Sequence, residues 1–157
     1  VPNDDDIMSG LMFDTRFHNV DALIDTVKPD VLKFNELNAF SGVIQKSVEA
    51  SKTLEKYALN LWKATRKPTD FGVKVTNVDM NRLVLAGASP RGMSMMLRAA
   101  RVNAWLNERT AITPEDIHAV FHETVAHRLV FSPVYEMRRT EIAREMLSNI
   151  INAVAAP

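Results

Sequence analysis

The chain has 157 residues, 46% of them hydrophobic, and its 19 basic and 19 acidic residues cancel to a formal net charge of zero. This composition supports one ordinary domain with or without an appendage, and it gives no overall electrostatic bias toward nucleic acid or an anionic membrane. The absence of cysteine excludes disulfides, thiolate metal sites and cysteine nucleophiles. No apolar run approaches the roughly 20 residues that span a bilayer, and no signal peptide opens the chain. We therefore expect a cytoplasmic protein without membrane insertion.

Apolar residues recur at helical spacing through most of the sequence, and only five glycines occur, which predicts an all-α fold. Three segments are expected: an N-terminal lead-in at residues 1–30, a helical domain at residues 31–132, and an amphipathic C-terminal helix at residues 133–157. The lead-in opens with the polar "VPNDDDIMSG" and lacks an initiator methionine. We interpret it as solvated chain with a short helix, either the end of a preceding domain or a linker, in a piece of a longer protein.

The helical domain is expected to open with two helices. The first spans residues 35–46 and has a predicted buried face of Leu37, Phe40, Val43 and Ile44. The second follows Ser51, a good N-cap, and runs to Arg66. Its apolar stripe consists of Leu54, Tyr57, Ala58, Leu61 and Trp62. The alternation in "VKVTNV" then predicts a short hairpin or an irregular loop around residues 70–80.

Two later helices begin with a hydroxyl cap and a proline, one at "SPRG" (residues 89–92) and one at "TPED" (residues 113–116). The second then supplies two acids, which favour the positive end of the helix dipole. The first supplies Arg91, a cation that is unfavourable there by roughly 0.3–1 kcal/mol. The helix that starts at residue 113 therefore places acids in its first turn, as helices usually do, whereas the helix that starts at residue 89 places a cation there.

Arg91 has two interpretations. A helix N-terminus offers free backbone N–H groups to an anion, and an arginine adds a planar charged fork that suits phosphate oxygens. Ser89, Pro90 and Arg91 would then form a phosphate-binding helix start. In the alternative, Arg91 leans away from the dipole and pairs with a nearby carboxylate.

Other candidate sites are weaker. His118 and His122 have the i, i+4 spacing of a zinc pair, and His127 follows, but no glutamate stands beside the first histidine. We favour amphipathic packing for them and expect no metal site. The basic clusters "LRAAR" and "MRRTEIAR" are short and lie near acids, so we expect solvated helix faces and no nucleic-acid partner.

The chain lacks the motifs that hold and hydrolyse a nucleotide. There is no G-x-x-x-x-G-K-[ST] phosphate loop (Walker A), and no apolar strand ends in paired acids (Walker B). We therefore expect no activity from this chain alone.

Residues 87–129, "GASPRGMSMMLRAARVNAWLNERTAITPEDIHAVFHETVAHRL", resemble the C-terminal lid of MoxR-type AAA+ ATPases. The shared motifs are G-A-S-P-R, L-R-A-A-R, an arginine-containing loop at Glu108-Arg109, T-P-E-D, and H-R-L at His127 to Leu129. Upstream, "YALNLWKATR" at residues 57–66 is similar to the family segment with A-T-R near a helix end. The likeness extends over residues 35–129.

The resemblance implies a helical-bundle lid in which Arg91 is the sensor-2 residue, held by Ser89 and Pro90 against ATP in the ATPase core. It implies ATP with Mg²⁺ as cofactor of the complete protein, and none bound by this chain alone. The implied partners are its own AAA+ core, neighbouring protomers in a hexamer, and a client protein that ATP hydrolysis remodels. The alternative is a non-catalytic all-α protein-interaction module that uses the same caps.

Overall fold

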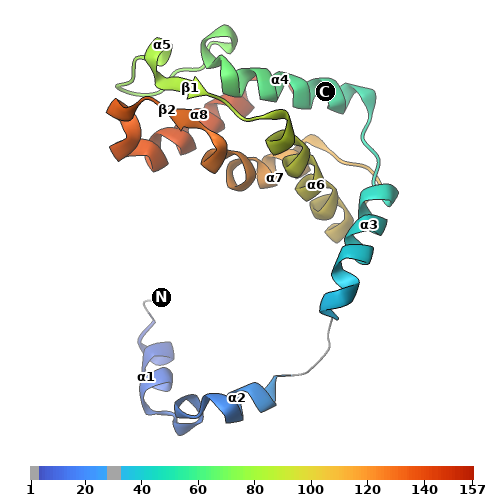
Figure 1. The fold of residues 1–157 in the computed structure, drawn as a ribbon, viewed down its shortest axis with the longest axis vertical. Helices are drawn as coiled ribbons and strands as arrows, with labels where there is room; N and C mark the ends of the chain where they lie inside the picture. The colour runs from blue at the N-terminus through green and yellow to red at the C-terminus, as the bar shows by residue number, and fades with distance from the viewer. Residues whose placement is uncertain (1–3, 28–32) are drawn as a thin grey trace. The chain divides into compact units, whose positions relative to one another are not determined.

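The computed structural model describes residues 4–27 and 33–157, and within these ranges it is predominantly helical (Figure 1). The all-α prediction is therefore confirmed. The chain divides into two compact units, residues 1–38 and residues 39–157. None of the helices in the described ranges has the length and apolar character needed to cross a membrane.

The N-terminal unit holds two short helices, α1 (Asp5–Phe13) and α2 (Val20–Thr26), which a 3₁₀ turn joins. α1 begins inside the segment that the polar sequence marked only as solvated lead-in. The Asp4 carboxylate explains this start, because it caps the helix by accepting a hydrogen bond from the Asp6 backbone N–H at 3.0 Å. No residue in the range 4–27 is buried, so these helices form no core of their own.

The C-terminal unit is built from helices that share one hydrophobic core. Their bounds are α3 Leu37–Ser47, which starts at the boundary between the units, α4 Lys52–Arg66, α5 Met80–Leu83, α6 Pro90–Leu106, α7 Pro114–Val125 and α8 Arg139–Ala153. Among the fully buried side chains are Leu61 of α4, Met96 of α6, Phe121 of α7 and Ile150 of α8. The stripe expected on α4 is buried as predicted, with Trp62 half-buried at its edge. The C-terminal helix α8 therefore belongs to the same core as the helices before it.

The buried face expected for α3 is mostly wrong. Ile44 is buried, but Leu37, Phe40 and Val43 are 43%, 41% and 63% exposed. Only the last turns of α3 reach the core, and the ring of Phe40 packs edge-on against Trp105 with ring centroids 5.2 Å apart. The apolar spacing is real, but among the described residues this face has no partner that covers it.

The segment "VKVTNV" at residues 73–78 forms no strand, and the irregular-loop alternative is correct. Its first two valines are buried, as the alternation requires. Its backbone, however, bonds to side chains of α8 instead of to a second strand. The Asn149 amide donates to the carbonyl oxygen of Lys74 at 2.8 Å, and the Thr76 N–H donates to Glu145 Oε1 at 2.8 Å. These side chains replace the ladder partner that a hairpin would have supplied.

A two-stranded sheet forms elsewhere. β1 (Val84–Ala86) pairs antiparallel with β2 (Val130–Phe131), and Val84 lies opposite Phe131. The sheet joins the segment that leads into α6 to the segment that follows α7. Figure 1 shows β1 running directly toward the first turn of α6.

Candidate functional site

The first turn of α6 has the cap that the sequence predicts. Ser89 is extended, and its Oγ accepts a hydrogen bond from the Gly92 N–H at 3.1 Å. Pro90 occupies the first helical position, where its missing N–H leaves no bond unmade. Arg91 follows at the second position, at the positive end of the helix dipole.

Arg91 is exposed, and among residues 4–27 and 33–157 its side chain makes no hydrogen bond or ion pair. The pairing with a nearby carboxylate, which was the alternative interpretation, is therefore not seen in the described part of the chain. No hydrogen bond or ion pair in that part offsets the unfavourable position of the cation. An anion that reached this helix start would meet the guanidinium and the backbone N–H of Arg91, because Pro90 has no N–H and the Gly92 N–H is bonded to Ser89 Oγ.

The segment before the cap is held against the last turns of α4. A Cβ atom on Gly87 would lie 2.5 Å from the carbonyl oxygen of Thr65, so only glycine fits at this approach. At Ala88, the N–H donates to Thr65 Oγ1 at 3.2 Å, and the carbonyl oxygen accepts from the Trp62 indole N–H at 2.8 Å. These contacts fix the point from which α6 departs.

A second arginine lies against the same turn. A Cβ atom on Gly92 would meet Cδ of Arg128 at 2.7 Å, so the stem of Arg128 crosses the first turn of α6. Its Nε donates to the carbonyl oxygen of Thr124 at 2.9 Å, which keeps the side chain along α7. The H-R-L motif thus supports the start of α6 by packing, a contact that the sequence pattern did not reveal.

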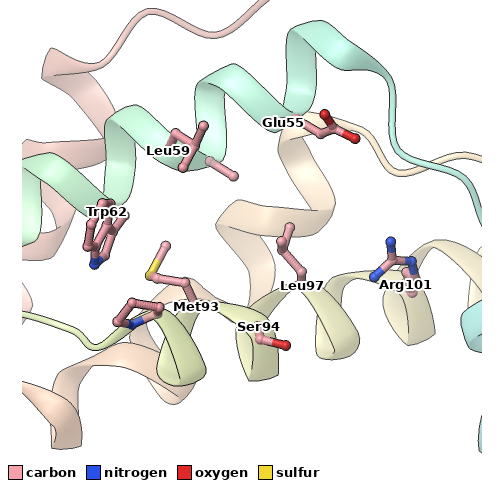
Figure 2. A pocket seen from close by; sticks show the side chains of 9 residues that line it. Glu55, Leu59, Trp62, Met93, Ser94, Leu97 and Arg101 are labelled. Atoms are coloured by element: carbon pink, nitrogen blue, oxygen red, sulfur yellow. The ribbon is translucent and has the colours of Figure 1, made fainter.

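An apolar groove of about 440 Å³ lies between α4 and α6 (Figure 2). Leu59, Met93 and Leu97 line it, and so do Trp62, which lies at one end in Figure 2, and Pro90, the residue before Arg91. Glu55 and Arg101 stand at the opposite end in Figure 2. Glu55 pairs with Lys52 at 2.8 Å, and Arg101, which is half-buried instead of free, donates from Nε to the carbonyl oxygen of Val48 at 3.1 Å.

The charged group at the start of α7 is satisfied by hydrogen bonds within the chain. Asp116 is fully buried, and its carboxylate accepts from Arg109 Nη2 at 2.6 Å, from Asn103 Nδ2 at 2.8 Å and from the Thr113 N–H at 2.9 Å. Arg109 also donates to the Thr113 hydroxyl at 2.7 Å. The predicted "TPED" cap is therefore present, and it holds α6 and α7 together.

The three histidines do not gather. His118 Nε2 and the Tyr57 hydroxyl are hydrogen-bonded at 2.7 Å, while His122 lies 3.6 Å from Glu123. Burial, together with the nearby negative charge of Glu115, raises the pKa of Tyr57, so the phenol stays protonated. Within the described ranges, no group of three or more histidines and acids is placed to hold a metal ion.

Comparison with known proteins bears on the same region. The family model described as AAA lid domain matches residues 80–150. The chain is 42% identical over all 157 residues to Protein MoxR of Methylorubrum extorquens, of which it covers 46%. It is 31% identical over 129 residues to Chaperone MoxR1 of Mycobacterium tuberculosis. This match covers 82% of this chain and 31% of that protein.

A solved structure is also similar. The crystal structure of a proposed ATPase from Cytophaga hutchinsonii matches with a TM-score of 0.67 and 28% identity, and the match covers 78% of this chain and 36% of that one. The chain spans less than half the length of each of these relatives.

Proposed function

This chain carries a MoxR-type AAA lid domain, and from that premise we propose that it is the lid of an AAA+ ATPase whose core binds ATP with Mg²⁺. The observation that carries the proposal is Arg91, an exposed cation at the positive end of α6 with no partner in the described part of the chain. A guanidinium in that position is stabilised when phosphate arrives, because the phosphate brings negative charge to the positive end of the helix dipole and accepts hydrogen bonds from the planar fork.

In this proposal Arg91 acts as the sensor-2 residue. Its guanidinium contacts the γ-phosphate of ATP held by the core and stabilises the charge that develops as the phosphoryl group leaves. Ser89 and Pro90 contribute by fixing the first turn of α6. Because the residues before Ser89 are held by α4, a change at the phosphate reaches the helical bundle as a change in its angle to the core.

The proposed partners follow from the same role. The lid contacts its own AAA+ core and neighbouring protomers, which we propose form a hexamer. The energy of ATP hydrolysis is then used to remodel a client protein, in keeping with the chaperone named among the relatives. This chain alone, which lacks both nucleotide-binding motifs, is not expected to turn over ATP.

The test uses the complete protein that carries this chain. Arg91→Ala should lower ATP turnover by about a hundredfold or more, and it should weaken ATP binding much less, because the contact strengthens in the transition state. Arg91→Lys should restore only part of the activity, since an ammonium lacks the planar fork. The matched control is Arg98→Ala, an exposed arginine two turns further along α6.

Two results would contradict the proposal. If Arg91→Ala leaves turnover at the level of Arg98→Ala, the sensor role is wrong even though the lid family remains. If the complete protein contains no phosphate loop, the chain is instead a non-catalytic helical interaction module, a function that the apolar α4–α6 groove also favours.

A further inference from the structure

We propose that Trp62 and Thr65 of α4 are positioning residues for Arg91. They hold the backbone at Ala88, and through it they set the direction in which α6 presents the guanidinium. This inference rests on the sensor role proposed for Arg91 above.

Both backbone groups of Ala88 end on side chains of α4. The Thr65 hydroxyl donates its own proton to the carbonyl oxygen of Trp62 at 2.7 Å, which leaves its lone pairs free to accept the Ala88 N–H at 3.2 Å. The Trp62 indole N–H then donates to the Ala88 carbonyl oxygen at 2.8 Å. Thr65 is fully buried and Ala88 is 2% exposed, so no solvent competes for the bonds between them.

The helix itself does not need these bonds. Ser89 already caps α6 through its Oγ, and Pro90 presets the first helical turn. The bonds to Ala88 add something different, because they fix the turn to another helix 23 and 26 residues earlier in the chain. The close approach of Gly87 to the Thr65 carbonyl further restricts movement of this backbone segment against α4.

Arg91 depends on this backbone for its direction. Its side chain makes no bond within residues 4–27 and 33–157, so no neighbouring group there steers it. It lies three residues beyond Ala88, at the start of a rigid helix. A small displacement of Ala88 therefore becomes a displacement of the guanidinium, and a misplacement of about 1 Å can lower a reaction rate on the order of a hundredfold.

The chain offers matched variants for a test. Thr65→Val removes the hydroxyl at nearly constant volume, while Thr65→Ser keeps it. Trp62→Phe removes the indole N–H and keeps an aromatic ring. The control is Trp105→Phe, which changes the other tryptophan of the chain, a half-exposed side chain that packs on Phe40 and makes no hydrogen bond among the described residues.

We would measure kcat and KM for ATP in the complete protein, for each variant with Arg91 present and with Arg91→Ala. With Arg91 present, Thr65→Val and Trp62→Phe should each lower kcat by about tenfold or more with little change in KM. Thr65→Ser and Trp105→Phe should stay within about twofold of the parent. With Arg91→Ala, the two damaging variants should cause no further loss, because the group that they position is gone.

The outcomes separate the two proposals. If Thr65→Val and Trp62→Phe lower kcat by the same factor with Arg91→Ala as they do with Arg91 present, the positioning role is overturned. A purely structural defect would lower kcat whichever residue stands at position 91. Unchanged kcat in Trp62→Phe overturns it as well, and this variant decides alone if thermal melting shows Thr65→Val to be unfolded. If Arg91→Ala itself has no effect, the sensor role fails first, and the positioning role falls with it.

Discussion

The starts of α6 and α7 both have a hydroxyl cap followed by a proline, and they have opposite electrostatics. At α7 the buried Asp116 carboxylate is bonded to Arg109, Asn103 and Thr113, so the charges at that helix start are satisfied within the chain. At α6 the charge that follows the proline is the exposed Arg91, which has no partner in the described ranges. The charge at the start of α7 is thus hydrogen-bonded inside the protein, whereas the charge at the start of α6 is exposed.

The difference separates stability from function. A buried and fully bonded carboxylate between two helices fixes their packing, and its removal is costly. An unpartnered cation at the positive end of a helix slightly destabilises the folded state. We infer that α7 begins as a structural joint and α6 as a contact surface for an anion, and the predictions below test each half of this comparison.

The largest effect is expected at Asp116. Asp116→Ala removes the carboxylate and leaves Arg109 and Asn103 without their acceptor, so the free energy of unfolding should fall by about 3 kcal/mol. Urea unfolding of the chain measures this. The exposed neighbouring acid gives the control: Glu115→Ala should cost less than about 1 kcal/mol. Equal losses in the two variants would mean that the start of α7 is not a buried joint.

A somewhat smaller effect is expected at Gly87, which seats the start of α6. Gly87→Ala places a Cβ against backbone atoms of Thr65 and Arg66 that cannot move away, and should destabilise the chain by about 1–3 kcal/mol. Gly42→Ala is the control of opposite sign, because nothing lies within 4 Å of its Cβ and alanine favours the helix by about 1 kcal/mol. An unchanged free energy of unfolding in Gly87→Ala would show that the backbone at Thr65 and Arg66 can move to accommodate the Cβ.

Arg91 should contribute almost nothing to stability. Arg91→Ala in this chain should leave the free energy of unfolding unchanged or raise it by up to about 1 kcal/mol, because it removes a cation from the positive end of α6. The same urea titration detects this. A loss of several kcal/mol would instead identify Arg91 as a structural residue and remove the contrast between the two helix starts.

The smallest effect concerns pH at the start of α7. Bonds from its own backbone N–H and from the Thr113 hydroxyl, with the positive charges of His118 and Arg109 nearby, lower the pKa of Glu115 below the ordinary 4.5. Because the folded pKa is the lower one, the stabilisation is present above pH 4.5 and is lost as the pH falls through the folded value. An NMR titration of the Glu115 carboxyl checks this, and a midpoint at or above 4.5 would contradict it.

The parts of the site that the sequence predicts are local. Ser89, Thr113 and the acids after Pro114 have their effect within one helical turn, so a few adjacent residues suffice to place the caps. The position of Arg91 on the first turn of α6 follows from the same pattern. The all-α fold follows from apolar spacing, which needs no knowledge of the partner helices.

The parts that the sequence missed depend on distant partners. The bond between Trp62 and Ala88 joins residues 26 apart, and no local pattern in the sequence indicated that the two segments meet. Apolar spacing on α3 could not show that most of that face is left uncovered among the described residues. Alternation at residues 73–78 could not show that side chains of α8 would take the place of a strand.

That replacement has a consequence for how the chain folds as it is synthesised. The loop bonds through Thr76 and Lys74 to Glu145 and Asn149 of α8, which are 69 and 75 residues later in the chain. A ribosome releases the N-terminal side first, so the loop emerges long before α8 exists to hold it. Its two buried valines, and the backbone amide of Thr76, cannot reach their final contacts with α8 until that helix has been synthesised. A chain arrested before Arg139 should therefore exchange the Thr76 amide proton freely, while a chain that includes α8 protects it.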